Sequence, residues 1–135
     1  MNYPNARKFK TSKRVKPTSK YHAQKVELDG HKFDSKAEAR YYSQLKRQGI
    51  DFRCHERFEL IPTIKLAGKT NPKRSYTPDF SIYEDGRLVR VIDVKGMRPT
   101  ADASLRFALF RSKYTVPVYI ARYDRKTGLF EEVLA

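Results

Sequence analysis

Residues 76–95 of this chain read YTPDFSIYEDGRLVRVIDVK, and this stretch decides the fold. Two runs rich in β-branched and aromatic residues flank residues 84–86, whose sequence Glu-Asp-Gly is typical of a hairpin turn. The stretch therefore predicts two antiparallel strands, over residues 76–83 and 87–95. Both faces of the second strand are largely apolar, which indicates a central strand that is covered on both sides.

The alternation of that second strand predicts which of its side chains share a face. One face should carry Leu88, Arg90, Ile92 and Val94, and the other should carry Val89, Val91, Asp93 and Lys95. The charged pair would then lie at the end of a buried strand, where it needs partners. A simple salt bridge between Asp93 and Lys95 is one interpretation of these two residues.

Asp79 favours a different interpretation. Counting outward from the turn, Asp79 and Asp93 should face each other across the hairpin within a residue or two of register. Two carboxylates that close repel each other and raise each other's pKa, and a divalent cation removes the repulsion. Ligation by oxygen alone suits Mg²⁺ or Mn²⁺. Lys95 can then align or activate an attacking water and offset the charge of a phosphorane.

A hairpin and a helix are predicted upstream. Residues 26–33 alternate around Asp-Gly, and residues 34–48 carry an apolar stripe with a spacing of four. That stripe consists of Phe33, Ala37, Tyr41 and Leu45. Ser35 and Glu38 form a Ser-x-x-Glu capping box, which favours a structural role for the glutamate. The two roles do not exclude each other, because a glutamate in the first turn can also reach a metal.

The remaining elements follow from the same kind of pattern. We expect strands at residues 52–61, 116–122 and 129–134, and a loop or a long hairpin tip at residues 62–74. The strand at 52–61 should turn Phe52, Cys54, Phe58 and Leu60 to one side. A second helix is expected at residues 104–114, with Leu105, Ala108, Leu109 and Ser112 on one side and Phe107 and Phe110 in the core. The order of helix, three antiparallel strands, helix and strand predicts a mixed α/β domain.

The charge is strongly positive and unevenly distributed. The 135 residues include 29 Lys and Arg against 15 Asp and Glu, a net charge of +14. Eight of the basic residues and no acidic residue lie in residues 1–26. We expect residues 1–20 to form a flexible basic segment and residues 21–135 to form one domain. The segment either only increases solubility or contacts phosphates of DNA, in the second case through Lys8, Lys10, Lys13 and Arg14.

Composition also excludes several classes. No stretch approaches the ~20 apolar residues of a membrane span, and we expect neither a secretory signal nor a membrane partner. The lone Cys54 cannot form an internal disulfide, which suits a reducing cytoplasm. One cysteine and three scattered histidines do not suggest a zinc site.

Four blocks of sequence occur in an order that resembles a known superfamily. They are Phe33-Asp34-Ser35-Lys36-Ala37-Glu38-Ala39, Phe58-Glu59-Leu60, Tyr76-Thr77-Pro78-Asp79-Phe80 and Asp93-Val94-Lys95-Gly96. Their Glu, Pro-Asp and Asp-x-Lys resemble the signature of the PD-(D/E)XK nucleases. More closely, residues 20–125 resemble small phage and prophage proteins described as related to archaeal Holliday junction resolvases.

The resemblance implies an αβββαβ, restriction-endonuclease-like core and metal-dependent DNA cleavage. It gives the catalytic positions to Glu38, Asp79, Asp93 and Lys95 and makes the Val94 carbonyl a further metal ligand. Two positions depart from the pattern, since His55 stands where Gln is expected and Arg106 stands where Lys is expected. His55 is a general base, a structural residue or a DNA contact, and the sequence leaves these alternatives open.

Basic residues that follow the Asp-x-Lys motif are candidate phosphate contacts. They are Arg98 and Thr100 before the second helix, and Arg106 and Arg111 on it. The leading hypothesis is therefore a Mg²⁺- or Mn²⁺-dependent endonuclease for four-way junctions or other branched DNA in phage recombination or replication. The alternatives are a non-catalytic basic nucleic-acid-binding module and a nicking or end-cutting endonuclease of the same fold.

A homodimer is also expected, because a four-way junction needs two symmetric nicks and a two-fold dimer supplies two facing sites. The hairpin at residues 26–33 and the loop around Gly68 are the candidate dimer contacts, since neither should be needed for the core.

Overall fold

A mixed five-stranded sheet organises the computed structural model, which describes residues 24–135. Its strands run in the order β11-β10-β9-β8-β3, with β9 antiparallel to β8 and parallel to β10. Their bounds are β3 (Asp51–Cys54), β8 (Phe80–Glu84), β9 (Arg87–Val94), β10 (Val118–Tyr123) and β11 (Phe130–Leu134). The predicted mixed α/β fold and the central position of β9 are confirmed. The order α1, β3, β8, β9, α2, β10 is the expected αβββαβ order, with strands added.

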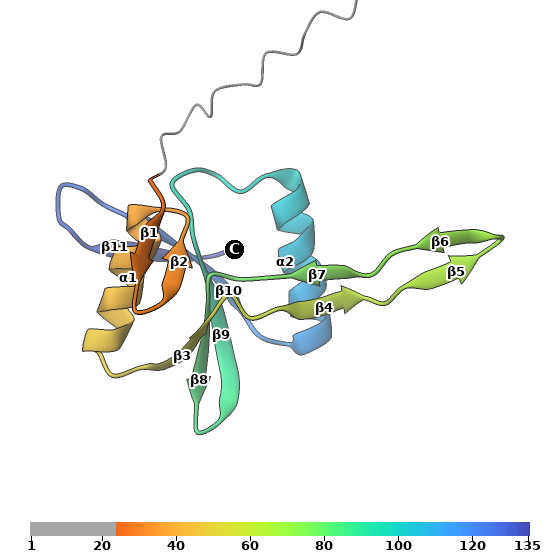
Figure 1. Cartoon of the computed structure of the whole chain (residues 1–135), viewed down its shortest axis with the longest axis horizontal. Helices are drawn as coiled ribbons and strands as arrows, with labels where there is room; N and C mark the ends of the chain where they lie inside the picture. Colours follow the sequence, from red (N-terminus) through yellow and green to blue (C-terminus); the bar gives the residue numbers. More distant parts are fainter. Residues whose placement is uncertain (1–23) are drawn as a thin grey trace, which may run out of the picture.

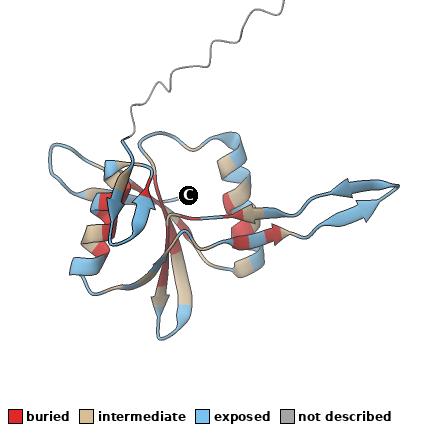
Figure 2. Ribbon diagram, viewed as in Figure 1, coloured by how far each residue is buried: buried red, intermediate tan, exposed pale blue. Residues whose placement is uncertain are grey.

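Two helices cover opposite faces of this sheet (Figure 1). Helix α1 (Lys36–Arg47) packs Tyr41 and Leu45 on the face that carries Ile92. Helix α2 (Ala101–Tyr114) packs against the face that carries Val91 and Val118. The buried residues follow β8, β9 and the inner sides of both helices (Figure 2). Neither helix is long and apolar enough to cross a membrane among the residues described.

The predicted hairpin consists of β1 (Val26–Leu28) and β2 (His31–Phe33) and is fastened to α1. Asp29 turns the chain at φ 50°, and its carboxylate accepts hydrogen bonds from Lys46 at 2.7 Å and Tyr42 at 3.0 Å. Phe33 is buried in the α1 side of the core. The expectation that this hairpin is not needed for the core is therefore wrong.

The strand predicted at residues 52–61 is two strands in two different sheets. The chain leaves β3 at His55, whose φ of 52° lies in the left-handed region, and resumes as β4 (Phe58–Ile61). Consequently Phe52 packs on the α1 side of the sheet and Phe58 on the α2 side, so the expected single face is wrong.

The segment that connects β3 to β8 forms a long projection, here called the arm (residues 58–76). Strand β4 pairs antiparallel with β7 (Arg74–Tyr76) at its base, and β5 (Ile64–Leu66) pairs with β6 (Lys69–Asn71) at its tip. The arm extends away from the sheet and helices (Figure 1). A long hairpin tip at residues 62–74 is thus confirmed, whereas the strand predicted at 76–83 is interrupted by residues 77–79.

Two further expectations about facing are wrong. A register shift between Ile82 and Tyr83 leaves Val89 as an extra residue in β9, so Leu88 packs on the α2 side and Val89 on the α1 side. Helix α2 begins at Ala101, three residues before the predicted start, because the Thr100 hydroxyl caps it. Leu105, placed on the packed face from sequence, is 60% exposed. Phe107 and Phe110 fill that face, as predicted.

Candidate metal centre

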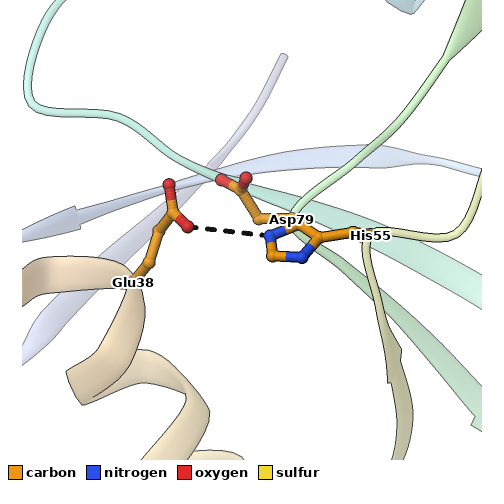
Figure 3. Close-up of side chains that lie close together, drawn as sticks. All are labelled: Glu38, His55 and Asp79. Carbon is orange, nitrogen blue, oxygen red and sulfur yellow. Dashed lines mark ion pairs between the residues drawn. The ribbon is translucent and has the colours of Figure 1, made fainter. Parts of the chain in front are cut away.

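Three side chains from separate elements converge at one end of the sheet. Glu38 lies in the first turn of α1, His55 follows β3, and Asp79 precedes β8. One ligand atom from each lies within 4.8 Å of the others. The three side chains point toward one another (Figure 3). The structure thus joins two predicted site residues to one whose role the sequence left open.

The register of the sheet explains the convergence. Cys54 pairs with Phe80 in the antiparallel β3–β8 ladder, so the next residues outward, His55 and Asp79, come side by side. The backbone N–H of His55 donates to the backbone carbonyl of Asp79 at 3.2 Å. The sequence did not predict this position of His55, because one continuous strand was expected over residues 52–61 and β3 ends at Cys54.

Asp79 is held in place by β9. Its Oδ2 accepts a hydrogen bond from the Val94 N–H at 2.7 Å. Burial, followed by the nearby charges of Asp93 and Glu38, raises its pKa from 3.8 to about 8. A cation beside this carboxylate would reverse that shift. Val94 therefore orients Asp79 through its N–H, and a metal contact through its carbonyl stays a prediction.

Asp93 is hydrogen-bonded to the backbone of Asp79, is 5% exposed, and is not one of the three residues of the cluster, so its role as a metal ligand stays a prediction. Its Oδ2 accepts from the Tyr76 hydroxyl at 3.0 Å, and its Oδ1 accepts from the Asp79 N–H at 3.2 Å. Burial raises its pKa, and Lys95 and the Tyr76 hydrogen bond oppose that shift. The predicted approach of Asp79 and Asp93 is confirmed, with Phe80 opposite Ile92 one step inward. Each Asp93 oxygen keeps a second lone pair for a further ligand.

Glu38 combines both of its candidate roles. Its N–H donates to Ser35 Oγ at 3.2 Å, and its Oε2 accepts from the Asp34 N–H at 3.4 Å. The same Oε2 lies 3.8 Å from His55 Nε2. Burial raises the Glu38 pKa, since the residue is 6% exposed. The capping geometry therefore aims the carboxylate into the cluster and does not compete with it.

The donor set fits a divalent cation. The buried carboxylate of Glu38, the half-buried carboxylate of Asp79 and the exposed imidazole of His55 face one space, and both carboxylates have raised pKa values that a cation would lower. Hard cations such as Mg²⁺ and Mn²⁺ prefer carboxylate oxygens, and an imidazole adds affinity for transition metals. His55 adopts its left-handed backbone at this point, a kind of strain that clusters at functional sites.

Lys95 lies where two hollows meet. A hollow of about 340 Å³ on the α2 side includes Asp79, Asp93, Arg57 and Arg106 in its lining, and Lys95 closes one side of it. A larger hollow of about 830 Å³ on the other side is lined by Lys95 together with four basic residues, Lys36, Arg40, Arg122 and Arg125. Sequence reasoning missed these four residues, although Arg122 lies at the end of β10, the strand next to β9.

The predicted DNA contacts have different surroundings. Arg106 lines the smaller hollow, where its Nη1 donates to the Ser75 carbonyl at 2.7 Å and its Nε to Asp102 at 3.0 Å. Arg111 instead donates to the Ala135 carbonyl at 2.9 Å. Arg98 is exposed, and Thr100 serves as the cap of α2. Lys8, Lys10, Lys13 and Arg14 lie outside the described residues, as does the segment 1–20.

The fold and the cluster define a mixed α/β protein with a carboxylate–imidazole cluster at one end of its sheet, next to a hollow that Asp79 and Lys95 help to line. The family model described as "Protein of unknown function (DUF1064)" matches residues 18–125, and the chain belongs to this family. No curated protein and no solved structure matches the chain.

Proposed function

We propose that this protein is a metal-dependent endonuclease that hydrolyses DNA phosphodiester bonds with Mg²⁺ or Mn²⁺. One observation carries the proposal: two buried carboxylates, Glu38 and Asp93, and the half-buried carboxylate of Asp79 lie close together in a strongly basic protein. Carboxylates in the wall of a basic groove repel a phosphate unless a cation lies between them. A protein that only binds nucleic acid gains nothing from such a cluster.

Glu38, Asp79 and His55 would hold the cation, and a carboxylate oxygen of Asp93 would be a further ligand. A bound divalent cation supplies a Lewis acid and lowers the pKa of its water. Tyr76 fixes the Asp93 carboxylate, and the Val94 N–H fixes the Asp79 carboxylate. Both positions are therefore set before substrate arrives, as an efficient site requires.

Lys95 lies close enough to Asp79 and Asp93 for its charge to lower the pKa of both, and it lines both hollows. Its ammonium group can align the attacking water and offset the negative charge that develops on the phosphorane. Lys95 would thus stabilise the negative charge that develops in the reaction, and the carboxylates would hold the metal.

Polyanion binding follows from the charge around the site. Lys36, Arg40, Arg122 and Arg125 line the larger hollow, and Arg57 and Arg106 line the smaller one. A phosphate backbone that passes from one hollow to the other crosses Lys95. The basic segment 1–20 would add affinity that depends on salt and not on sequence.

The substrate we propose is branched DNA, four-way junctions above all, cut by a homodimer during phage recombination or replication in the bacterial cytoplasm. This choice rests on the resemblance to resolvase-related phage proteins and on the match between a two-fold substrate and a two-fold dimer. Nicking and end-cutting activities would use the same site.

The test is a panel of labelled four-way junction, flap, duplex and single strand, each with Mg²⁺, Mn²⁺ or excess chelator. We expect paired nicks near the branch point, in the presence of metal only. Cleavage of duplex alone would keep the nuclease and remove the junction preference. Binding to every substrate without cleavage in any metal would instead support the non-catalytic binding module.

A further inference from the structure

The outer half of the arm makes no contribution to either core. Phe58, Leu60 and Tyr76 anchor its base against α2, and the Tyr114 hydroxyl donates to the Glu59 carbonyl at 2.8 Å. Beyond Pro62, every residue of β5 and β6 is exposed, which Figure 2 shows as the pale-blue end of the arm. An isolated two-stranded ribbon is marginally stable in water. A ribbon that extends without support gains stability when a partner covers it.

The charge of this ribbon selects the partner. Residues 62–74 contain three lysines, one arginine and no acidic residue. Lys65 and Lys69 make no ion pair with any residue between 24 and 135. A second copy of the chain would bring an equally basic arm, and like charges would oppose the contact. A polyanion is the complementary partner.

The shape of the ribbon narrows the kind of polyanion. The register pairs Leu66 with Lys69 and Lys65 with Thr70, so the two lysines lie on opposite faces and both faces carry a cation. The B-form major groove admits a two-stranded ribbon of this width between its two phosphate backbones. From Pro62 to Leu66 the extended chain spans roughly 13 Å, four steps of about 3.3 Å, which is close to the groove width of about 12 Å.

Two other nucleic acids fit less well. Single strands bind mainly by stacking bases on aromatic rings, and residues 62–74 contain no aromatic residue. The large exposed apolar side chains of this segment are the aliphatic Ile64 and Leu66, at 44% and 70% exposure. Duplex RNA has a deep, narrow major groove that a ribbon does not enter.

The arm also starts and ends at the metal centre. Strand β4 begins three residues after His55, and β7 ends three residues before Asp79. Arg57, Ser75 and Thr77 at its base line the smaller hollow beside Asp93. DNA held at the site is therefore led directly to the arm.

We infer that the outer arm, residues 62–73, is a clamp that inserts into the major groove of a B-form DNA duplex beside the metal centre. The inference rests on the proposed function for the position of the DNA. It adds that the substrate has a duplex segment next to the bond that is cut.

The test compares K65A/K69A with a matched variant, R47A/R87A, which removes two exposed charges from the end of α1 and the start of β9. Binding to a 20-base-pair DNA duplex and to an RNA duplex of the same sequence is measured by anisotropy in excess chelator, at several salt concentrations. Two lost phosphate contacts should make the slope of log K against log salt shallower by about 2 on DNA. The matched variant should keep the wild-type slope, and the RNA slope should hardly change.

Three results would overturn the clamp: an unchanged slope for K65A/K69A, an equal change in the matched variant, or an equal change on RNA. Light scattering that shows a dimer turned into a monomer, with DNA affinity unchanged, would assign the arm to a second copy instead. Cleavage is scored separately on four-way junction, flap, duplex and single strand, with Mg²⁺ or Mn²⁺. Binding through the arm without cleavage of any of these substrates ends the nuclease proposal and leaves the clamp standing. Cleavage together with an unchanged salt slope in K65A/K69A keeps the nuclease proposal and removes the clamp.

Discussion

The candidate metal centre and the outer arm carry opposite charges and differ in how far they are buried. Glu38 and Asp93 are buried and Asp79 is half-buried, and desolvation raises the pKa of each. Lys65 and Lys69 stand on an exposed ribbon that packs against no core. The first arrangement costs stability and the second leaves a ribbon unsupported. We therefore propose a separate partner for each region, a divalent cation for the carboxylate cluster and a DNA duplex for the outer arm.

Replacing Asp79 or Asp93 should have the largest effect, because it should abolish cleavage and leave duplex binding by the arm unchanged. Asp79→Asn and Asp93→Asn should each reduce cleavage by at least about a hundredfold, because the metal loses a ligand fixed by a backbone N–H or by Tyr76. Duplex binding in chelator should stay as in the wild type, since the arm is unchanged. Gel assays and anisotropy measure the two effects. Wild-type cleavage by Asp93→Asn would remove that residue from the site.

Glu38 offers a way to separate a helix cap from a metal ligand. Glu38→Gln keeps an oxygen that accepts from the Asp34 N–H but loses the charge, so cleavage should fall with an almost unchanged Tm. The control is Ser35→Ala, which removes the cap and costs about 1 kcal/mol of stability. That variant should lower the Tm and keep most of the activity. Equal activity of Glu38→Gln and the wild type would return Glu38 to a purely structural role.

His55 should set which metal the site prefers. An imidazole favours transition metals over Mg²⁺, so Mn²⁺ should bind more tightly than Mg²⁺ to the wild type. His55→Gln should narrow that preference by about tenfold. Calorimetry with each cation measures it, and His31→Gln, at an exposed position in β2, is the control. A preference that does not change would leave His55 with only its contact to the Glu38 carboxylate.

The stability of the metal-free protein should also depend on pH. Asp79 has a folded pKa of about 8 against an ordinary value of 3.8, so the folded state binds the extra proton between these values. The free energy of unfolding should therefore fall as pH rises from about 4 to about 8. Thermal melts in chelator at several pH values measure the fall, and Asp79→Asn should flatten it. Stability that rises over this range would mean that Asp79 is ionised without a metal.

Local signals predicted the parts of the fold that depend on neighbouring residues. The Asp-Gly turns at residues 29–30 and 85–86 and the cap at Ser35 appear where their sequences place them. The register from the second turn also brought Asp79 next to Asp93. These features are decided by backbone conformation within a few residues, which sequence reports directly.

Tertiary effects account for the failures. The left-handed turn at His55 is adopted by a residue that does not favour it, and the surrounding sheet has to impose it. The extra residue at Val89 shifts every later side chain of β9, and no residue type marks it. Leu105 is apolar yet exposed, because Phe107 and Phe110 are larger and fill the space beside Val118. The assignment of His55 to the cluster therefore needed the ends of β3 and β8, which the sequence did not predict.

Cleavage of a labelled four-way junction tests the central claim most directly, namely that Glu38 and Asp79 bind a cation used to cut DNA. Wild type and Asp79→Asn are incubated with the junction in Mn²⁺, in Mg²⁺ and in excess chelator, and the cut strands are quantified. The account predicts cleavage by the wild type with either metal, none in chelator and none by Asp79→Asn. Cleavage by the wild type in chelator, or by Asp79→Asn at the wild-type rate, would contradict it.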